Sequence, residues 1–86
     1  MPGIIFTLYI LKSTKNNKYY IGQTNDLARR LREHNTGQSS STKHGIPWEV
    51  VFNQEFPTRS EARKVEMKLK KMKSRKFIED YILRYS

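Results

Sequence analysis

The spacing of apolar residues along this chain alternates between strand-like and helix-like, and this order constrains the fold more than any other feature. Ile4–Leu11, Tyr19–Gly22 and Trp48–Phe56 have the aromatic and branched residues typical of strands. The first two are separated by a polar turn segment, so we expect a hairpin. Helical spacing follows the second strand once and the third strand twice. The predicted order of strand, strand, helix, strand, helix, helix indicates an α+β domain, with a short three-stranded antiparallel sheet flanked by helices.

Capping residues precede each of the three helical segments. Thr24 or Asn25 can cap the first helix and Ser74 the last, while Thr58 and Glu61 have the spacing of a capping box before the second. The side chains expected to be buried by the three helices are Leu27, Leu31 and His34, then Ala62, Val65, Leu69 and Met72, and finally Phe77, Ile78, Tyr81, Ile82 and Tyr85. One face of the third strand is expected to carry Trp48, Val50 and Phe52.

The length of 86 residues allows a single domain, spanning residues 1–86, with a small core. The chain has no cysteine, which excludes a disulfide framework and a cysteine-based metal site. No apolar run approaches the roughly 18 residues that a membrane-spanning helix needs. The first apolar segment is short and lacks the preceding basic region of a secretion signal. We therefore expect a cytoplasmic protein, and association with the nucleoid is compatible with this location.

A surplus of positive charge is the first indication of function. Seventeen lysine and arginine residues oppose eight aspartate and glutamate residues, so the net charge is +9, and nine of the seventeen fall within Arg59–Lys76. This balance favours a polyanionic partner, with nucleic acid, DNA or RNA, as the leading candidate. Charge alone also allows a solubilising surface, or a membrane-surface or ribosomal partner. The sequence is compatible with a monomer or a weak homodimer.

Five residues that could carry chemistry also have ordinary structural interpretations. Tyr9 and Tyr20 could be core aromatics of two strands. Arg30 and His34 share a helix face because they are four residues apart. An arginine cluster is nevertheless often a solvated surface, and a histidine at a helix end is often structural. Glu66 lies at the shoulder of the apolar stripe of its helix, and its structural alternative is a solvent-facing pair with Lys70, one turn later.

The order of these residues resembles the GIY-YIG nuclease superfamily. Thr7-Leu8-Tyr9 stands for the first motif, Tyr20-Ile21-Gly22 is the intact second motif, and Arg30 and Glu66 follow on later helices. The segment after the second motif is similar to that of small stand-alone members, which are similar to the N-terminal nuclease domain of the bacterial excision-repair endonuclease. The resemblance covers nearly the whole chain, and the ordered set is far more specific than the tyrosine motif alone.

The resemblance implies a metal-dependent endonuclease that hydrolyses DNA phosphodiester bonds, in repair or recombination. Tyr9 would take a proton from the attacking water, with the support of Tyr20. Nearby cations would help, because they stabilise a tyrosinate whose pKa is otherwise about 10. Arg30 would hold the scissile phosphate, and Glu66 would be the single protein ligand of Mg²⁺ (or Mn²⁺). His34 is a candidate proton carrier.

A second set of residues is expected to contact the DNA backbone. Thr42 and Lys43 resemble a polar-basic pair of the stand-alone members, although a mobile surface loop explains them equally well. The lysine-rich second helix has the character of a phosphate-tracking surface, which adds affinity without base specificity. The predicted nucleic-acid contacts are Arg29, Thr42, Lys43, Lys68, Lys71 and Lys73.

Two departures from the family pattern and one rival function remain. Thr7 replaces the glycine of the first motif, and Gln23 stands where the excision-repair endonuclease has lysine. The second change puts in doubt a mechanism that needs another cation beside the tyrosines. The alternative function is a basic nucleic-acid-binding module with weak catalysis, and the intact tyrosines, arginine and glutamate argue against it.

Overall fold

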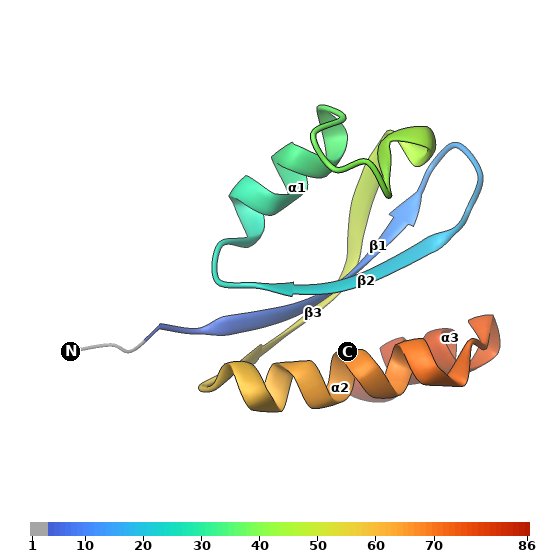
Figure 1. Ribbon diagram of the computed structural model, residues 1–86. Helices are drawn as coiled ribbons and strands as arrows, with labels where there is room; N and C mark the ends of the chain where they lie inside the picture. Colours follow the sequence, from blue (N-terminus) through green and yellow to red (C-terminus); the bar gives the residue numbers. More distant parts are fainter. Residues whose placement is uncertain (1–3) are drawn as a thin grey trace.

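Three antiparallel strands form the centre of the molecule, and helices lie on both faces of the sheet (Figure 1). In the computed structural model, which describes residues 4–86, the strand order is β2-β1-β3. The elements are β1 (Phe6–Ser13), β2 (Tyr19–Thr24), α1 (Leu27–Asn35), the short 3-10 helix η1 (Lys43–Gly45), β3 (Trp48–Phe56), α2 (Arg59–Met72) and α3 (Arg75–Tyr85). The predicted α+β architecture and order of elements are confirmed, and η1 is an addition to them.

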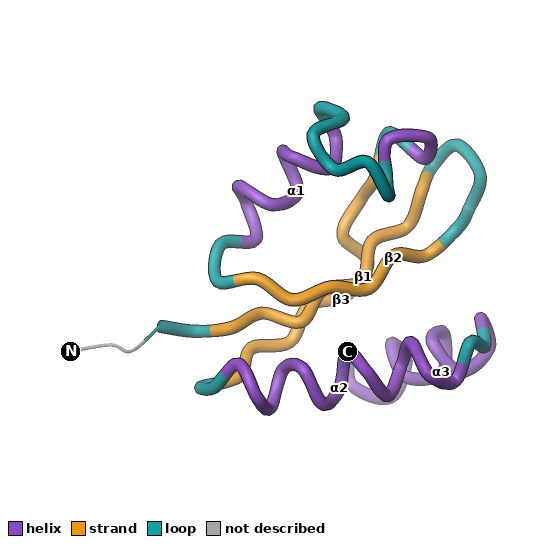
Figure 2. The backbone as a smooth tube through the Cα atoms, in the orientation of Figure 1, coloured by secondary structure: helices purple, strands orange, loops and turns teal. Residues whose placement is uncertain are grey.

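The central strand β1 supplies side chains to two apolar layers, because successive strand residues point to opposite faces. Leu8 and Ile10 point to the face that α2 and α3 cover. Tyr9 and Leu11 point to the other face, which α1 and the loop before β3 cover (Figure 2). All four side chains are buried. Tyr9 is thus held in the layer between the sheet and α1.

A β-bulge interrupts the pairing of β1 with β3. Ile10 pairs with Phe52 and Leu11 with Val50, so Val51 is an extra residue on the bulged strand. Val50 consequently packs in the layer under α1, while Phe52 packs in the layer under α2 and α3. The prediction of a single face was wrong for the set Trp48, Val50 and Phe52. The extra residue reverses which sheet face the following side chains point to. The strand propensity of the residues does not indicate where such a bulge occurs.

Side-chain caps begin all three main helices. Thr58 and Ser74 accept hydrogen bonds from backbone N–H groups three residues later, as predicted. The cap of α1 is Asp26, not Thr24 or Asn25. Thr24 still belongs to β2, and its hydroxyl accepts a bond from the backbone N–H of Asp26. The β2–α1 connection is therefore a tight turn that brings α1 back over the sheet.

The ends of the elements differ slightly from the predicted boundaries. Met72 and Tyr85 are about half exposed, each as the last residue of its helix, so neither belongs to the buried stripe. Strand β1 begins at Phe6, which leaves Ile4 and Ile5 outside it and exposed. Within residues 4–86, no helix combines the length and the apolar character required to cross a membrane.

Candidate active site

Tyr9 lies at the centre of a buried polar cluster on the α1 side of the sheet. It is 1% exposed, and its hydroxyl lies 3.0 Å from Nε2 of His34. Tyr9 pairs with Gly22 across β1 and β2. A Cβ at Gly22 would lie 2.6 Å from the Tyr9 hydroxyl oxygen, closer than real Cβ contacts come. The glycine of the second motif therefore provides the space that the Tyr9 phenol occupies.

His34 reaches Tyr9 from the last turn of α1 and is completely buried. Its Nδ1 lies 2.7 Å from Oγ1 of Thr42, so both ring nitrogens have partners. The Tyr20 ring packs on the imidazole, with 4.9 Å between the ring centroids. Burial, and then the charge of Arg30, lowers the pKa of His34, because both disfavour the imidazolium form. The ring is therefore neutral at neutral pH.

Arg30 lies one turn before His34 on the same side of α1. Its Nη1 donates to Oε1 of Glu33 at 3.0 Å, and its guanidinium is close enough to Tyr9 to lower the pKa of that phenol. The Arg30 side chain remains 32% exposed, so it can contact a ligand as well. The preceding Arg29 is 57% exposed and lies 3.9 Å from Glu33. The two arginines are adjacent in the sequence, but the structure distinguishes them because Arg30 is less exposed than Arg29.

Burial makes Tyr9 a weaker acid. Removal from water raises the pKa of Tyr9 to about 12, and the nearby Arg30 guanidinium offsets this only in part. Arg30 does lower the pKa of Tyr9, as expected of a nearby cation, but desolvation has the larger effect in the protein alone. A tyrosinate here requires a proton acceptor in direct contact, and Nε2 of His34 is in that position.

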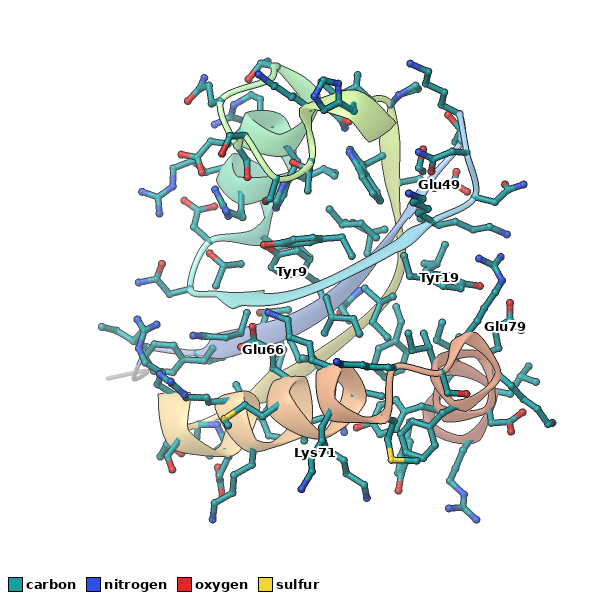
Figure 3. The ribbon with its side chains drawn as sticks, turned by 45° about the vertical axis from the view of Figure 1, so that its right-hand side comes forward. Tyr9, Tyr19, Glu49, Glu66, Lys71 and Glu79 are labelled. Atoms are coloured by element: carbon teal, nitrogen blue, oxygen red, sulfur yellow. The ribbon has the colours of Figure 1, made fainter. Side chains whose placement is uncertain are left out.

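Glu66 approaches the cluster from α2, on the other side of the sheet (Figure 3). Its side chain is 16% exposed, and Oε2 accepts a bond from Nζ of Lys70 at 2.7 Å. The Lys70 ammonium lies 6.0 Å from the centroid of the Tyr20 ring. Because Tyr20 packs in the α1 layer, this contact passes around the edge strand β2. Glu66 is therefore both a largely buried carboxylate and the i,i+4 partner of Lys70.

The oxygen donors on the α2 side suit a cation that keeps most of its water. Within residues 4–86, no three His, Cys, Asp or Glu side chains come together as a metal site. Gln23 pairs with Leu8 and shares the sheet face that α2 covers, and its Oε1 is buried without a hydrogen-bond partner among the described residues. Mg²⁺ often binds through one or two protein oxygens and retains several waters. The Glu66 carboxylate and the unpartnered Gln23 amide oxygen, both on that face, are ligand atoms of the kind that such an ion prefers.

The loop between α1 and β3 is anchored, and it buries Thr42. Trp48 Nε1 donates to the Thr42 carbonyl at 2.8 Å, and the Asn35 amide forms two hydrogen bonds with the backbone of Trp48. Thr42 is 1% exposed and its hydroxyl contacts His34. The prediction that Thr42 touches the DNA backbone is therefore wrong, because its side chain faces the interior. Lys43 is exposed, and its contact with DNA stays a prediction.

The basic residues predicted to bind DNA do not all share one surface, although Lys68 and Lys71 line one groove along α2. Lys71 projects from the side of α2 opposite the sheet (Figure 3). Lys68 faces α3, and Lys73 follows the last residue of α2 in a left-handed conformation. Among the residues of α1 and α2 that are predicted to contact DNA, only Arg29 lies on α1, the helix that also carries His34. A DNA segment bound along α2 by Lys71 would therefore lie away from the buried cluster.

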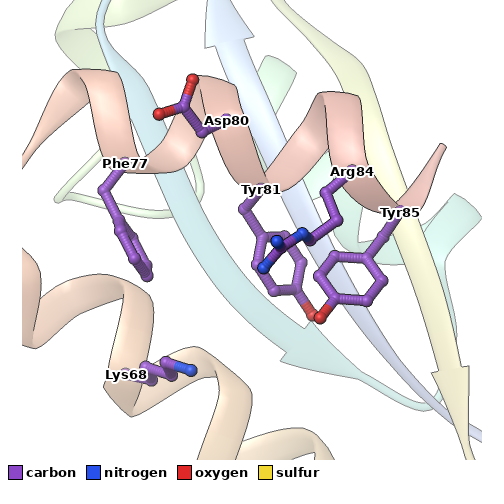
Figure 4. A pocket seen from close by; sticks show the side chains of 6 residues that line it. All are labelled: Lys68, Phe77, Asp80, Tyr81, Arg84 and Tyr85. Atoms are coloured by element: carbon purple, nitrogen blue, oxygen red, sulfur yellow. The ribbon is translucent and has the colours of Figure 1, made fainter.

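A separate groove lies between α2 and α3 (Figure 4). It is lined by Lys68, Phe77, Asp80, Tyr81, Arg84 and Tyr85. Two of its polar groups have partners: the Tyr81 hydroxyl donates to Oε1 of Gln54 at 2.7 Å, and Asp80 pairs with Lys76 at 3.4 Å. The five candidate catalytic residues lie outside this groove, so we do not assign it to the site.

Known proteins match this chain over most of its length. The sequence pattern of the GIY-YIG catalytic domain matches residues 5–79. A UPF0213 protein of Listeria welshimeri is 43% identical over 76 residues, which cover 87% of this chain and 82% of that protein. The structure-specific endonuclease subunit slx1 of Schizosaccharomyces pombe is 41% identical over 70 residues, which cover 71% of this chain and 25% of that protein.

A solved structure supports the same architecture. The solution NMR structure of a UPF0213 protein from Bacillus halodurans has a TM-score of 0.62 and 28% sequence identity to this chain. The match covers 94% of this chain and 85% of the NMR structure. The arrangement of sheet and helices described above is therefore shared with an experimentally determined relative.

Two contacts of the cluster were not predicted. The first is the Lys70 ammonium near Tyr20, a cation beside the tyrosines where Gln23 provides none. The i,i+4 spacing of Lys70 from Glu66 is the sequence signal that could have indicated it. The hydrogen bond between Thr42 and His34 had no comparable signal. It joins a helix to a loop residue, and the conformation of that loop depends on tertiary contacts.

Proposed function

The chain belongs to the GIY-YIG catalytic domain family, and on that premise we propose that it is a metal-dependent endonuclease that hydrolyses phosphodiester bonds of DNA. The observation that carries the proposal is the buried hydrogen bond between Tyr9 and His34, with the Arg30 guanidinium beside it. A phenol with a proton acceptor on its hydroxyl, next to a partly exposed cation, has the parts that water activation and phosphate binding require.

Tyr9 and His34 activate the water as a pair in this proposal. The proton of the attacking water passes to the phenol oxygen while the proton of Tyr9 passes to Nε2 of His34. The high pKa of Tyr9 makes this coupled transfer necessary, because free tyrosinate is scarce at neutral pH. The water oxygen forms the new bond to phosphorus. The bond from phosphorus to the leaving sugar oxygen breaks with its electron pair on that oxygen, which takes a proton from solvent.

Positive charge stabilises the phosphate in the proposed reaction. Arg30 donates to the non-bridging oxygens, and its bond to Glu33 holds the guanidinium in place. Mg²⁺ or Mn²⁺, bound at Glu66, would supply charge that stabilises the leaving oxygen. Lys70 occupies Oε2 of Glu66 and would compete with a cation for that oxygen, and its ammonium lies 6.0 Å from the centroid of the Tyr20 ring.

The biological setting forms part of the same proposal. One relative is named as a structure-specific endonuclease subunit, which supports structured DNA as the substrate and repair or recombination as the process. The net charge of +9 supports binding to a nucleic acid, with RNA as the second choice. We place the protein in the cytoplasm, with the nucleoid as its site of action, as a monomer or weak homodimer.

The test is cleavage of labelled DNA single strands, duplexes, flaps and four-way junctions, with Mg²⁺, Mn²⁺ or a chelator. We expect metal-dependent cleavage that Tyr9→Phe abolishes and Tyr19→Phe preserves. Tyr19 is a matched control, because its hydroxyl donates to Glu79 on α3, away from the cluster. Normal binding without cleavage in any metal would reject the nuclease and support the rival, a basic nucleic-acid-binding module.

A further inference from the structure

We propose that Thr42 is a positioning residue that fixes the tautomer of His34, so that Nε2 is free to accept the proton of Tyr9. The proposal deepens the function proposed above and rests on it for its catalytic meaning. Its structural basis is the continuous buried chain from Tyr9 through His34 to Thr42, with contacts of 3.0 Å and 2.7 Å. All three side chains are at most 1% exposed, so both contacts are buried in the protein alone.

The partners of Tyr9 set the direction of the hydrogen bonds. The hydrogen-bond partner of the Tyr9 hydroxyl is Nε2 of His34, and the Arg30 guanidinium is the nearby charged group that lowers the pKa of the phenol. A guanidinium has only donors, so it cannot accept the proton of Tyr9. That proton must go to His34, which requires Nε2 to be unprotonated. A neutral imidazole with a free Nε2 carries its proton on Nδ1, and this proton points to Oγ1 of Thr42.

The surroundings of Thr42 complete the chain of donors. Its hydroxyl can donate to the Ser39 carbonyl, which lies 3.4 Å away, while its oxygen accepts the Nδ1 proton. In the reverse direction, with Thr42 donating to Nδ1, Nε2 would carry a proton toward the Tyr9 oxygen. The proton of Tyr9 would then have no acceptor among the described side chains. Only the first direction gives every buried proton in the chain an acceptor.

The protein holds Thr42 in place through its backbone. Trp48 donates from its indole to the Thr42 carbonyl at 2.8 Å. The Ser13 hydroxyl donates to the carbonyl of Gly45 at 2.6 Å, which ties the following turn to β1. The position of the Thr42 hydroxyl is therefore determined by strands β1 and β3, although it lies in a loop.

A hydroxyl on Nδ1 has a different effect from the carboxylate that often orients a catalytic histidine. A carboxylate adds negative charge and favours imidazolium, whereas a neutral hydroxyl orients the ring without that effect. The other groups facing His34 are Tyr9, Tyr20, Arg30 and Glu33. The charge of Arg30 disfavours imidazolium and that of Glu33 favours it. Thr42 thus accepts the Nδ1 proton of the tautomer that the Tyr9 contact requires, and it adds no charge to the ring.

The test compares Thr42→Val with Thr42→Ser in the full chain labelled with ¹⁵N at histidine. The ¹⁵N chemical shifts of the imidazole report which nitrogen carries the proton. We expect the Nδ1–H form of His34 in the wild type and in Thr42→Ser. We expect a loss of that form in Thr42→Val, which keeps the shape and deletes the hydroxyl. Cleavage by Thr42→Val should fall by about tenfold to a hundredfold in kcat, with little change in KM.

The outcomes separate this proposal from the nuclease proposal. An Nε2–H form in the wild type, or an unchanged Nδ1–H form in folded Thr42→Val, would overturn the role of Thr42. If Thr42→Val does not fold, the wild-type tautomer and its retention in Thr42→Ser decide the question. If the wild type cuts no nucleic acid but the tautomer responds to Thr42 as expected, the positioning role stands and the nuclease function fails.

Discussion

Gly22 and Tyr9 approach each other so closely across β1 and β2 that a Cβ at Gly22 would lie 2.6 Å from the Tyr9 hydroxyl oxygen and 2.7 Å from Cζ. Gly22 does not have a positive φ angle, so the requirement for glycine is steric and not conformational. Tyr9 cannot swing aside without losing its hydrogen bond to His34. The two tyrosine motifs of the sequence thus form one packed unit, in which the second makes room for the first.

Gly22→Ala is expected to disturb both stability and activity. Overpacking at a buried contact costs about 1–3 kcal/mol of unfolding free energy, and displacement of Tyr9 should reduce cleavage at least tenfold. Urea unfolding and single-turnover cleavage measure the two effects. In a Tyr9→Leu background the stability cost should be smaller, because both of the nearest atoms, the hydroxyl oxygen and Cζ, have been removed. Equal costs in the two backgrounds would show that the contact is not the cause.

Arg30→Ala should reduce the cleavage rate by about a hundredfold or more and weaken DNA binding only slightly. A preorganised cation acts mainly on charge that develops in the transition state, whereas ground-state affinity is spread over many basic residues. Arg29→Ala is the matched control, since Arg29 is the adjacent, more exposed residue on the same helix. Circular dichroism must show that both variants are folded. Equal rates for the two variants would remove Arg30 from the site.

Lys70→Met should increase the affinity of the protein for Mn²⁺ by about two- to fivefold, because it removes the ammonium that occupies Oε2 of Glu66. Mn²⁺ binding can be followed by electron paramagnetic resonance without DNA. Lys71→Met should leave the affinity unchanged, since Lys71 projects from the opposite side of α2. Glu66→Gln should abolish the binding. An affinity that does not respond to Lys70→Met would mean that metal and lysine do not compete.

Stability should decline at alkaline pH because of Tyr9. Its pKa in the folded protein is about 12, against about 10 in the unfolded chain, so the folded state holds this proton more tightly. The associated stability is fully present below pH 10 and is lost as pH rises through 12. It amounts to about 2–3 kcal/mol. Urea unfolding of the wild type and Tyr9→Phe between pH 8 and about 11.5 tests this, and parallel curves for the two proteins would contradict it.

Local physical chemistry allowed much of this protein to be predicted from its sequence. Residue type and spacing indicated all three strands and all three main helices, and the caps at Thr58 and Ser74 are confirmed. These features depend on neighbours within a few residues, so the sequence contains the relevant information. The ordered motif also singled out Tyr9, and the resemblance to the stand-alone members singled out His34; their side chains prove to be in contact.

Tertiary structure alone decided how these elements meet. The bulge at Val51 determines which layer receives Phe52. The anchored loop turns Thr42 inward onto His34, although the sequence suggested a contact with DNA. Burial raises the pKa of Tyr9, although the nearby cation suggested the opposite. Each of these outcomes depends on packing between segments distant along the chain, and on the water that this packing excludes, which no local pattern of residues encodes.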